Sequence, residues 1–191
     1  MPETSVDQPL PDQILEPLEL WWENMHTDAP QDLYLPRGLW VTGPSGCGTS
    51  YVAKRAMRRA EREDPFWSLR AEQMPSAVGA ARLMANVRDM WTLQSNTRNS
   101  DDITAWQAYD RIVTQVEWWL DDAPVTFIDN LHATYDASFW TKHIGQRLED
   151  KIKEGRGVII ASDMSPEDVV GRKWPNLFVV CEVDEDSFAE R

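Results

Sequence analysis

Gly38-Leu-Trp-Val-Thr-Gly-Pro-Ser-Gly-Cys-Gly-Thr-Ser-Tyr-Val-Ala-Lys54 is the stretch that decides the fold of this chain. Its apolar run of Leu39, Trp40 and Val41 predicts a buried strand, which a glycine-rich turn and then a helical pattern follow directly. Glycine permits backbone conformations closed to other residues, so the amides of such a turn can converge on an anion. The helix that follows directs the positive end of its dipole toward the same point. This order of strand, loop and helix predicts a phosphate-binding loop.

One residue of the loop departs from the usual phosphate-binding pattern, G-x-x-x-x-G-K-[ST]. Residues 43–50 match this pattern except that Thr49 stands where the lysine belongs. Loss of that cation costs on the order of 2–5 kcal/mol of phosphate binding. Lys54, Arg55 and Arg58 follow in the helix, and we predict that they lie too far from the loop to replace it. The residues predicted to hold phosphate are Gly43, Pro44, Ser45, Gly46, Cys47, Gly48, Thr49 and Ser50.

The composition is that of a globular chain with an acidic surface. The chain has 191 residues, enough for one domain with a substantial core, and its net charge is −13. This charge weighs against a protein that coats nucleic acid by electrostatics alone, although a local basic patch is compatible with it. Cys47 and Cys181 form no zinc or redox spacing, and the N-terminus lacks the basic and apolar regions of a secretory signal. No apolar run approaches the roughly 20 residues that cross a bilayer. We therefore expect a reduced, cytoplasmic protein that does not enter a membrane.

The sequence divides into four parts. Residues 1–13 carry three prolines among polar and acidic residues and are predicted to be a disordered tail. Residues 14–36 contain a linker and a helix with an apolar stripe, which either docks on the domain or anchors a partner. Residues 37–184 form the phosphate-binding domain, and residues 185–191 form an acidic tail. The helix after the loop carries basic residues along one side over residues 54–62. This side is either a solvated face or a contact for nucleic acid or an acidic partner.

Four further apolar runs are predicted as strands, with helical patterns between them. Their alternation predicts an α/β sandwich of three layers, with a five-stranded parallel sheet covered on both faces. Asp129 ends the third strand, and Ser162 and Asp163 end the fourth. Ligands bind such sheets where strands end, so we expect these residues beside the loop, with Ser50 and Asp129 as ligands of Mg²⁺. The predicted strands are residues 66–69, 125–129, 157–162 and 177–183, and the predicted helices after the loop helix are residues 77–93, 105–120 and 138–154.

Three motifs in this order resemble the AAA+ ATPases, and within them the group of DnaA, DnaC and IstB. They are the loop itself (Walker A), Val125-Thr-Phe-Ile-Asp-Asn-Leu (Walker B) and Gly157-Val-Ile-Ile-Ala-Ser-Asp-Met-Ser-Pro166 (sensor 1). The resemblance implies a sheet order of 5-1-4-3-2, ATP or ADP with Mg²⁺ as ligands, and a helicase, initiator or transposase-like protein as partner. It also implies that copies of the chain can form a homo-oligomer. The catalytic roles that it implies fall to Asp129, Asn130, Asp163 and Arg172, the last as an arginine finger for a neighbouring subunit.

Four departures from this group limit the activity that the resemblance implies. Thr49 replaces the Walker A lysine, and Asn130 replaces an acidic residue that activates water. Asp163 stands where asparagine is more common, and the sequence ends after the fifth strand, so we expect no helical lid. We therefore expect a replication or recombination accessory that binds nucleotide weakly and hydrolyses it poorly. Two alternatives stay open: a small ATPase or phosphotransferase that a partner completes, and an interaction module without nucleotide.

Overall fold

The structure is a computed structural model that describes residues 10–28, 35–63, 76–97, 102–131, 136–170 and 175–188. The strands are β1 (Gly38–Thr42), β2 (Ala77–Gly79), β3 (Val125–Leu131), β4 (Gly157–Ser162) and β5 (Phe178–Glu182). The α-helices are α1 (Asp12–His26), α2 (Thr49–Glu63), α4 (Ala80–Thr97), α5 (Ile103–Glu117), α6 (Ala137–Trp140), α7 (Gln146–Lys153) and α8 (Pro166–Val170). Two π-helical segments, η1 (Trp118–Asp122) and η2 (Thr141–Gly145), and two 3-10 turns, η3 (Pro175–Leu177) and η4 (Asp186–Phe188), complete the elements.

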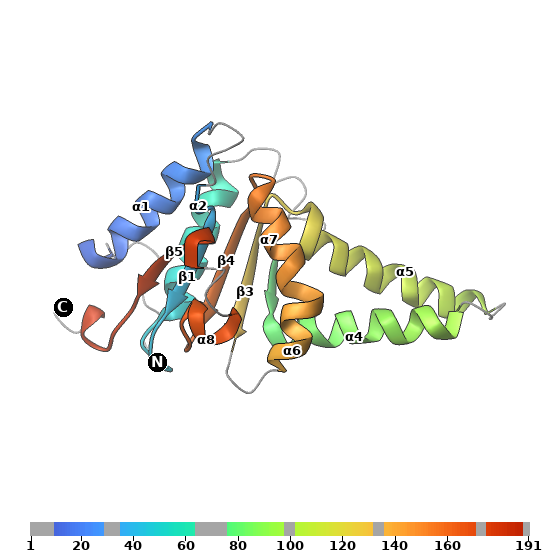
Figure 1. The fold of residues 1–191 in the computed structure, drawn as a ribbon. Helices are drawn as coiled ribbons and strands as arrows, with labels where there is room; N and C mark the ends of the chain where they lie inside the picture. The colour runs from blue at the N-terminus through green and yellow to red at the C-terminus, as the bar shows by residue number, and fades with distance from the viewer. Residues whose placement is uncertain are drawn as a thin grey trace.

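The five strands form one parallel sheet in the order β2-β3-β4-β1-β5 (Figure 1). This order is the predicted 5-1-4-3-2 arrangement read from the other edge, so the predicted fold class is confirmed. β1 lies between β4 and β5, where Trp40 is opposite Ile160 on one side and Val180 on the other. Because the strands are parallel, β1, β3 and β4 all end at the same edge of the sheet, where ligands of such folds bind.

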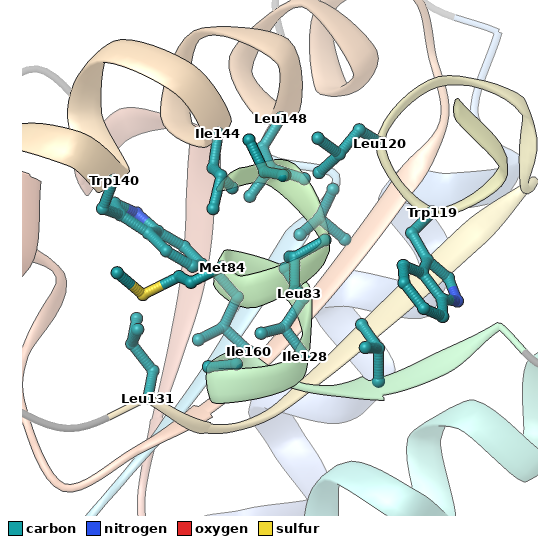
Figure 2. Packing of buried hydrophobic residues seen from close by; sticks show 14 of the residues in the cluster. Leu83, Met84, Trp119, Leu120, Ile128, Leu131, Trp140, Ile144, Leu148 and Ile160 are labelled. Atoms are coloured by element: carbon teal, nitrogen blue, oxygen red, sulfur yellow. The ribbon is translucent and has the colours of Figure 1, made fainter. Parts of the chain in front are cut away.

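Helices cover both faces of the sheet, as a three-layer sandwich requires. Side chains alternate across β1: Trp40 joins the hydrophobic cluster under α4 and α7, whereas Leu39 and Val41 join the cluster under α2. Figure 2 shows the first of these clusters, in which side chains of α4, η1 and α7 meet the sheet at Ile128 and Ile160. The near-continuous apolar strands of the sequence are thus explained by burial on both faces.

The N-terminal helix α1 docks on the domain, which is one of the two roles predicted for it. Trp21 is buried, and its Nε1 donates to the carbonyl oxygen of Arg37 at 3.0 Å. From the neighbouring helix α2, the guanidinium of Arg59 lies 2.6 Å from the carboxylate of Glu19 and over the ring of Trp22. The helix is therefore tied to the domain by apolar burial and by one basic residue of α2.

Several boundaries differ from the prediction, and at two of them the kind of structure differs as well. Ala77–Gly79 forms the edge strand β2 and not the start of a helix, because it pairs with β3 next to Asp129. At the N-terminus, α1 begins at Asp12 and Leu10 is already buried, so ordered structure starts inside the segment predicted as a tail. The strand that we predicted at residues 66–69 lies outside the described residues.

Helices α4 and α5 pack side by side and project from the body of the molecule (Figure 1). Asn86 of α4 donates from Nδ2 to Oε1 of Gln115 in α5 at 3.2 Å, which fixes the pair near its base. Trp91 and Trp106 are exposed on these two helices. Five other tryptophans are buried core residues: Trp21, Trp40, Trp118, Trp119 and Trp140.

Within the part of the chain that the structure describes, no helix combines the length and the apolar character needed to cross a membrane.

Candidate functional site

The glycine-rich loop between β1 and α2 depends on its glycines for two different reasons. Gly46 and Gly48 have φ angles of +90° and +107°, a backbone region that residues other than glycine rarely adopt. Gly43 is needed because the chain approaches closely: a Cβ atom built there would lie 1.9 Å from the carbonyl oxygen of Val183. The loop is thereby clamped against the residue that follows β5.

Replacement of Gly43 by alanine is therefore expected to destabilise the fold by about 1–3 kcal/mol, because backbone must move to admit the methyl group. Gly79→Ala is the matched control, since a Cβ atom at Gly79 meets nothing within 4 Å. The control is expected to change stability by less than about 1 kcal/mol. Urea unfolding of both variants measures the effect, and equal midpoints for Gly43→Ala and wild type would contradict the clamp.

A pocket of about 200 Å³ lies between the loop and the ends of β3 and β4. This volume is below the roughly 300–1,000 Å³ of sites that enclose a whole small molecule, and it suits phosphate groups better than a complete nucleotide. The pocket brings together most of the predicted site, and its lining residues are Gly43, Ser45, Gly46, Gly48, Thr49, Ser50, Asn130, Ala161, Ser162 and Asp163.

Asp129, the carboxylate at the end of β3, contacts two side chains of α2. The hydroxyl of Ser50 donates to its Oδ1 at 2.5 Å, and Nζ of Lys54 lies 3.6 Å from its Oδ2. The side chain of Asp129 is 17% exposed, whereas that of Lys54 is 55% exposed. Our prediction for Lys54 concerned only its distance from the loop, and its contact with this carboxylate was not predicted. Ser50 and Lys54 are four residues apart, and this spacing places them on the same face of α2.

Asn130 follows in a left-handed conformation, with a φ angle of +57°. Asparagine is among the few residue types that tolerate this region. The turn directs the amide N–H of Asn130 to Oδ1 of Asp129 at 3.1 Å and coincides with a break in the pairing of β3 with β4. Asn130 thus lines the pocket and fixes the carboxylate, but its amide side chain cannot accept a proton from water.

The turn after β4 holds Asp163 at the pocket. The hydroxyl of Ser162 donates to the carbonyl oxygen of Leu131 at 2.6 Å and accepts the amide of Met164 at 3.0 Å. The carbonyl oxygen of Met164 in turn accepts a hydrogen bond from Nε1 of Trp40 at 2.8 Å. Ser162 is therefore occupied in fixing the turn, and Asp163 is the exposed polar residue at this strand end.

Cys47 fills the inner side of the loop. Burial raises the pKa of its thiol, and the charges of Asp184 and Glu185 raise it further, while backbone hydrogen bonds at Thr49 and at Cys47 itself lower it. The net direction is upward from 9.0, so the group is a thiol at neutral pH. This supports a packing role for Cys47 in the loop and not that of a nucleophile.

The segment after β5 folds back onto the loop, although we predicted residues 185–191 as an acidic tail. Ser187 is buried and accepts a hydrogen bond from Nε2 of Gln13 at 2.9 Å. The ring of Phe188 packs edge-on against Tyr51 and lies 3.0 Å from the position of a Cβ atom on Gly48. The local sequence of this segment carries no signal for these contacts, because both partners are distant in the chain.

The basic side of α2 is largely engaged within the chain. Arg59 contacts Glu19 and Glu63, and Lys54 lies at Asp129, so only part of the predicted basic face points to solvent. Lys54, Arg58 and Arg62 are its exposed members, and of these Lys54 contacts Asp129. Arg172, predicted as an arginine finger, lies outside the described residues.

The described residues contain no cluster of three or more histidine, cysteine, aspartate or glutamate side chains arranged for a metal ion. Magnesium in nucleotide sites is held by one or two protein oxygens together with phosphate oxygens. Ser50 and Asp129 supply such a pair of oxygens, but the ammonium of Lys54 lies against the same carboxylate.

Comparison with known proteins identifies the fold. No family model and no curated protein matches the sequence. Among solved structures, AMPPCP-bound DnaA from Aquifex aeolicus is similar with a TM-score of 0.52 and 14% identity, over 96% of this chain and 50% of that chain. A DNA replication initiation factor of known crystal structure is similar with a TM-score of 0.54 and 12% identity, again over 96% and 50%.

The chain therefore has the AAA+ P-loop fold of DnaA, which confirms the fold that the motifs implied. At these identities the likeness concerns the fold alone. The chain spans about half the length of the solved chains that it matches.

Proposed function

We propose that this chain binds the phosphates of ATP or ADP in the loop of residues 43–50 and hydrolyses ATP poorly. We also propose that it serves DNA replication or recombination through protein partners. The observation that carries the proposal is the pocket between the loop, Asn130 and Asp163. Its size fits phosphate groups, and it lies at the N-terminus of α2, where backbone amides and the helix dipole favour an anion. The similar DnaA structure contains AMPPCP, a triphosphate nucleotide analogue, which agrees with this class of ligand.

Weak hydrolysis follows from the residues that surround the pocket. Thr49 supplies no positive charge to the β- and γ-phosphates, and Asn130 cannot act as a general base. Asp163 adds a negative charge near the position of the terminal phosphate, which disfavours that group further. Ser50 and Asp129 are the two groups that could hold Mg²⁺, which would neutralise phosphate charge, but only once Lys54 has moved away from the carboxylate.

Action through partners is supported by the exposed aromatic residues on the projecting helices α4 and α5. Trp91, Trp106 and Ile103 are exposed there, and tryptophan is enriched in the energetically important parts of protein interfaces. We propose a helicase, an initiator or a transposase-like protein as the partner, on the basis of the AAA+ fold that the chain shares with DnaA. A further copy of this chain is the alternative partner, in which case the protein acts as a homo-oligomer.

A nucleotide-free interaction module is the second candidate, because the carboxylate of Asp129 already has partners within the chain. Lys54 neutralises Asp129, and Phe188 packs beside Gly48 at the loop. The third candidate, an ATPase or phosphotransferase completed by a partner, requires that the partner supply the missing cation and base.

Calorimetric titration with ATP and ADP tests the proposal, and we expect dissociation constants between micromolar and millimolar. Thermal unfolding is the second readout, since a ligand at 100 times its dissociation constant stabilises the folded state by about 2.7 kcal/mol. Thr49→Asp is the matched control: an acidic residue suits the first turn of a helix but repels phosphate. The variant should fold normally and bind nothing. Wild type that gives neither heat nor a thermal shift with millimolar nucleotide would exclude nucleotide binding and favour the interaction module.

A further inference from the structure

Lys54 occupies an unusual position for a cation in a phosphate-binding loop protein. It lies one helical turn beyond Ser50 on the same face of α2, and its Nζ is 3.6 Å from Oδ2 of Asp129. The other oxygen of this carboxylate accepts hydrogen bonds from the hydroxyl of Ser50 and the amide of Asn130. Both oxygens of Asp129 therefore have donors within the chain, and one of these donors carries a full positive charge.

This arrangement changes what the carboxylate can do for a metal ion. Asp129 and Ser50 are the two groups that would hold Mg²⁺, and the ammonium lies against the same carboxylate. A divalent ion placed there would lie within a few ångströms of a like charge, at a carboxylate that is largely shielded from water. Metal binding would thus require that Lys54 move away.

We propose that Lys54 takes the place of the divalent cation, so that the loop binds polyphosphate as the free anion without Mg²⁺. This inference rests on the proposed function and specifies that the ligand binds as the metal-free anion. The side chain of Lys54 is 55% exposed on a flexible stem, so its ammonium can turn from Asp129 toward a phosphate at Ser50. A lysine binds phosphate as a compact point charge and needs no fixed orientation.

The same inference accounts for the loss of the usual lysine at position 49. The positive charge absent from the loop is present five residues later in α2, beside Asp129. The ligand class is a linear polyphosphate, either as the tail of a nucleoside triphosphate or as free tripolyphosphate. The small pocket, lined by the loop, Asn130 and Asp163, contacts the phosphates in either case.

The experiment is a set of calorimetric titrations with ATP and with tripolyphosphate, each in excess Mg²⁺ and in EDTA. Wild type is expected to bind ATP in EDTA within about threefold of its affinity in Mg²⁺. Lys54→Met is expected to lose about tenfold or more in EDTA, and to recover in Mg²⁺ because the metal can then occupy Asp129. Arg58→Met, one turn further on the same helix, is the control, with changes below about twofold.

The outcomes separate this inference from the proposed function. Two results would overturn the role of Lys54 and leave nucleotide binding intact. One is that wild type binds ATP only with Mg²⁺, and the other is that Lys54→Met binds ATP as tightly as wild type in EDTA. Absence of binding for both ligands in every buffer would overturn both proposals. Binding of tripolyphosphate as tight as that of ATP would identify the phosphate chain as the recognised part, whereas ATP binding alone would show that the nucleoside is recognised as well.

Discussion

Thr49→Lys is expected to tighten ATP binding by tens to thousands of times, which corresponds to about 2–5 kcal/mol. Thr49 is the first residue of α2, and it lines the pocket between Gly48 and Ser50. A lysine there would place its ammonium beside a phosphate bound at the loop amides, at the position where phosphate-binding loops carry it. The change adds an interaction to a loop whose backbone Gly43, Gly46 and Gly48 already fix.

Thr49→Met is the control, because it adds length at the same position without charge. Calorimetric titration of the three proteins should show a large gain for lysine and little change for methionine. Turnover of ATP by Thr49→Lys is expected to stay low, since Asn130 still provides no general base. A folded Thr49→Lys variant with no gain in affinity would show that the loop does not present its amides to phosphate.

The parts of the fold that local patterns determine could be predicted from the sequence. The runs at residues 157–162 and 125–129 are apolar and long enough to be recognised as strands, although β3 continues to Leu131, and the loop is marked by its glycines. β2 could not be predicted, because three residues at a sheet edge carry almost no pattern. Ala77–Gly79 becomes a strand only through its pairing with Phe127, Ile128 and Asp129.

The positions of the site residues could be predicted from the sequence, but most of their side-chain contacts could not. The sequence places Asp129 and Asp163 at strand ends and Ser50 in the loop after the first strand, and a parallel sheet brings these positions together at one edge. The contact of Lys54 with Asp129 was missed, although its spacing of four residues from Ser50 was a signal that could have found it. The packing of Phe188 on the loop has no such signal, because it depends on where the chain turns after β5.

Lys151 is expected to make the stability of the protein rise with pH above about pH 7. Its side chain is 2% exposed, and Nζ donates to the carbonyl oxygen of Trp119 at 3.1 Å and to the hydroxyl of Thr126 at 2.8 Å. Burial lowers the pKa of Lys151 from 10.5 to about 7, with Arg156 and Arg147 acting in the same direction and Asp121 and Asp122 against it. The folded state thus holds this proton less tightly than the unfolded state does.

The sign of the pH effect follows from these two pKa values. Between about pH 7 and 10.5 the unfolded state binds more protons at Lys151, so the free energy of unfolding rises with pH in this window. The contribution is fully present above pH 10.5 and is lost as the pH falls to about 7. Its slope is at most about 1.4 kcal/mol per pH unit for one group.

Lys151→Met is therefore expected to stabilise the protein at pH 7 by about 1–4 kcal/mol, because an apolar side chain of similar length replaces a buried ionisable one. The hydroxyl of Thr126 still donates to the carbonyl oxygen of Trp119 at 2.5 Å, so neither group loses its last partner. Urea unfolding of wild type, Lys151→Met and the exposed control Lys142→Met at pH 7, 8 and 9 measures the difference. The gain from Lys151→Met should shrink as the pH rises, while Lys142→Met follows wild type throughout. Parallel pH profiles for Lys151→Met and wild type would mean that Lys151 keeps its proton in the folded state, with its two oxygen acceptors compensating for burial.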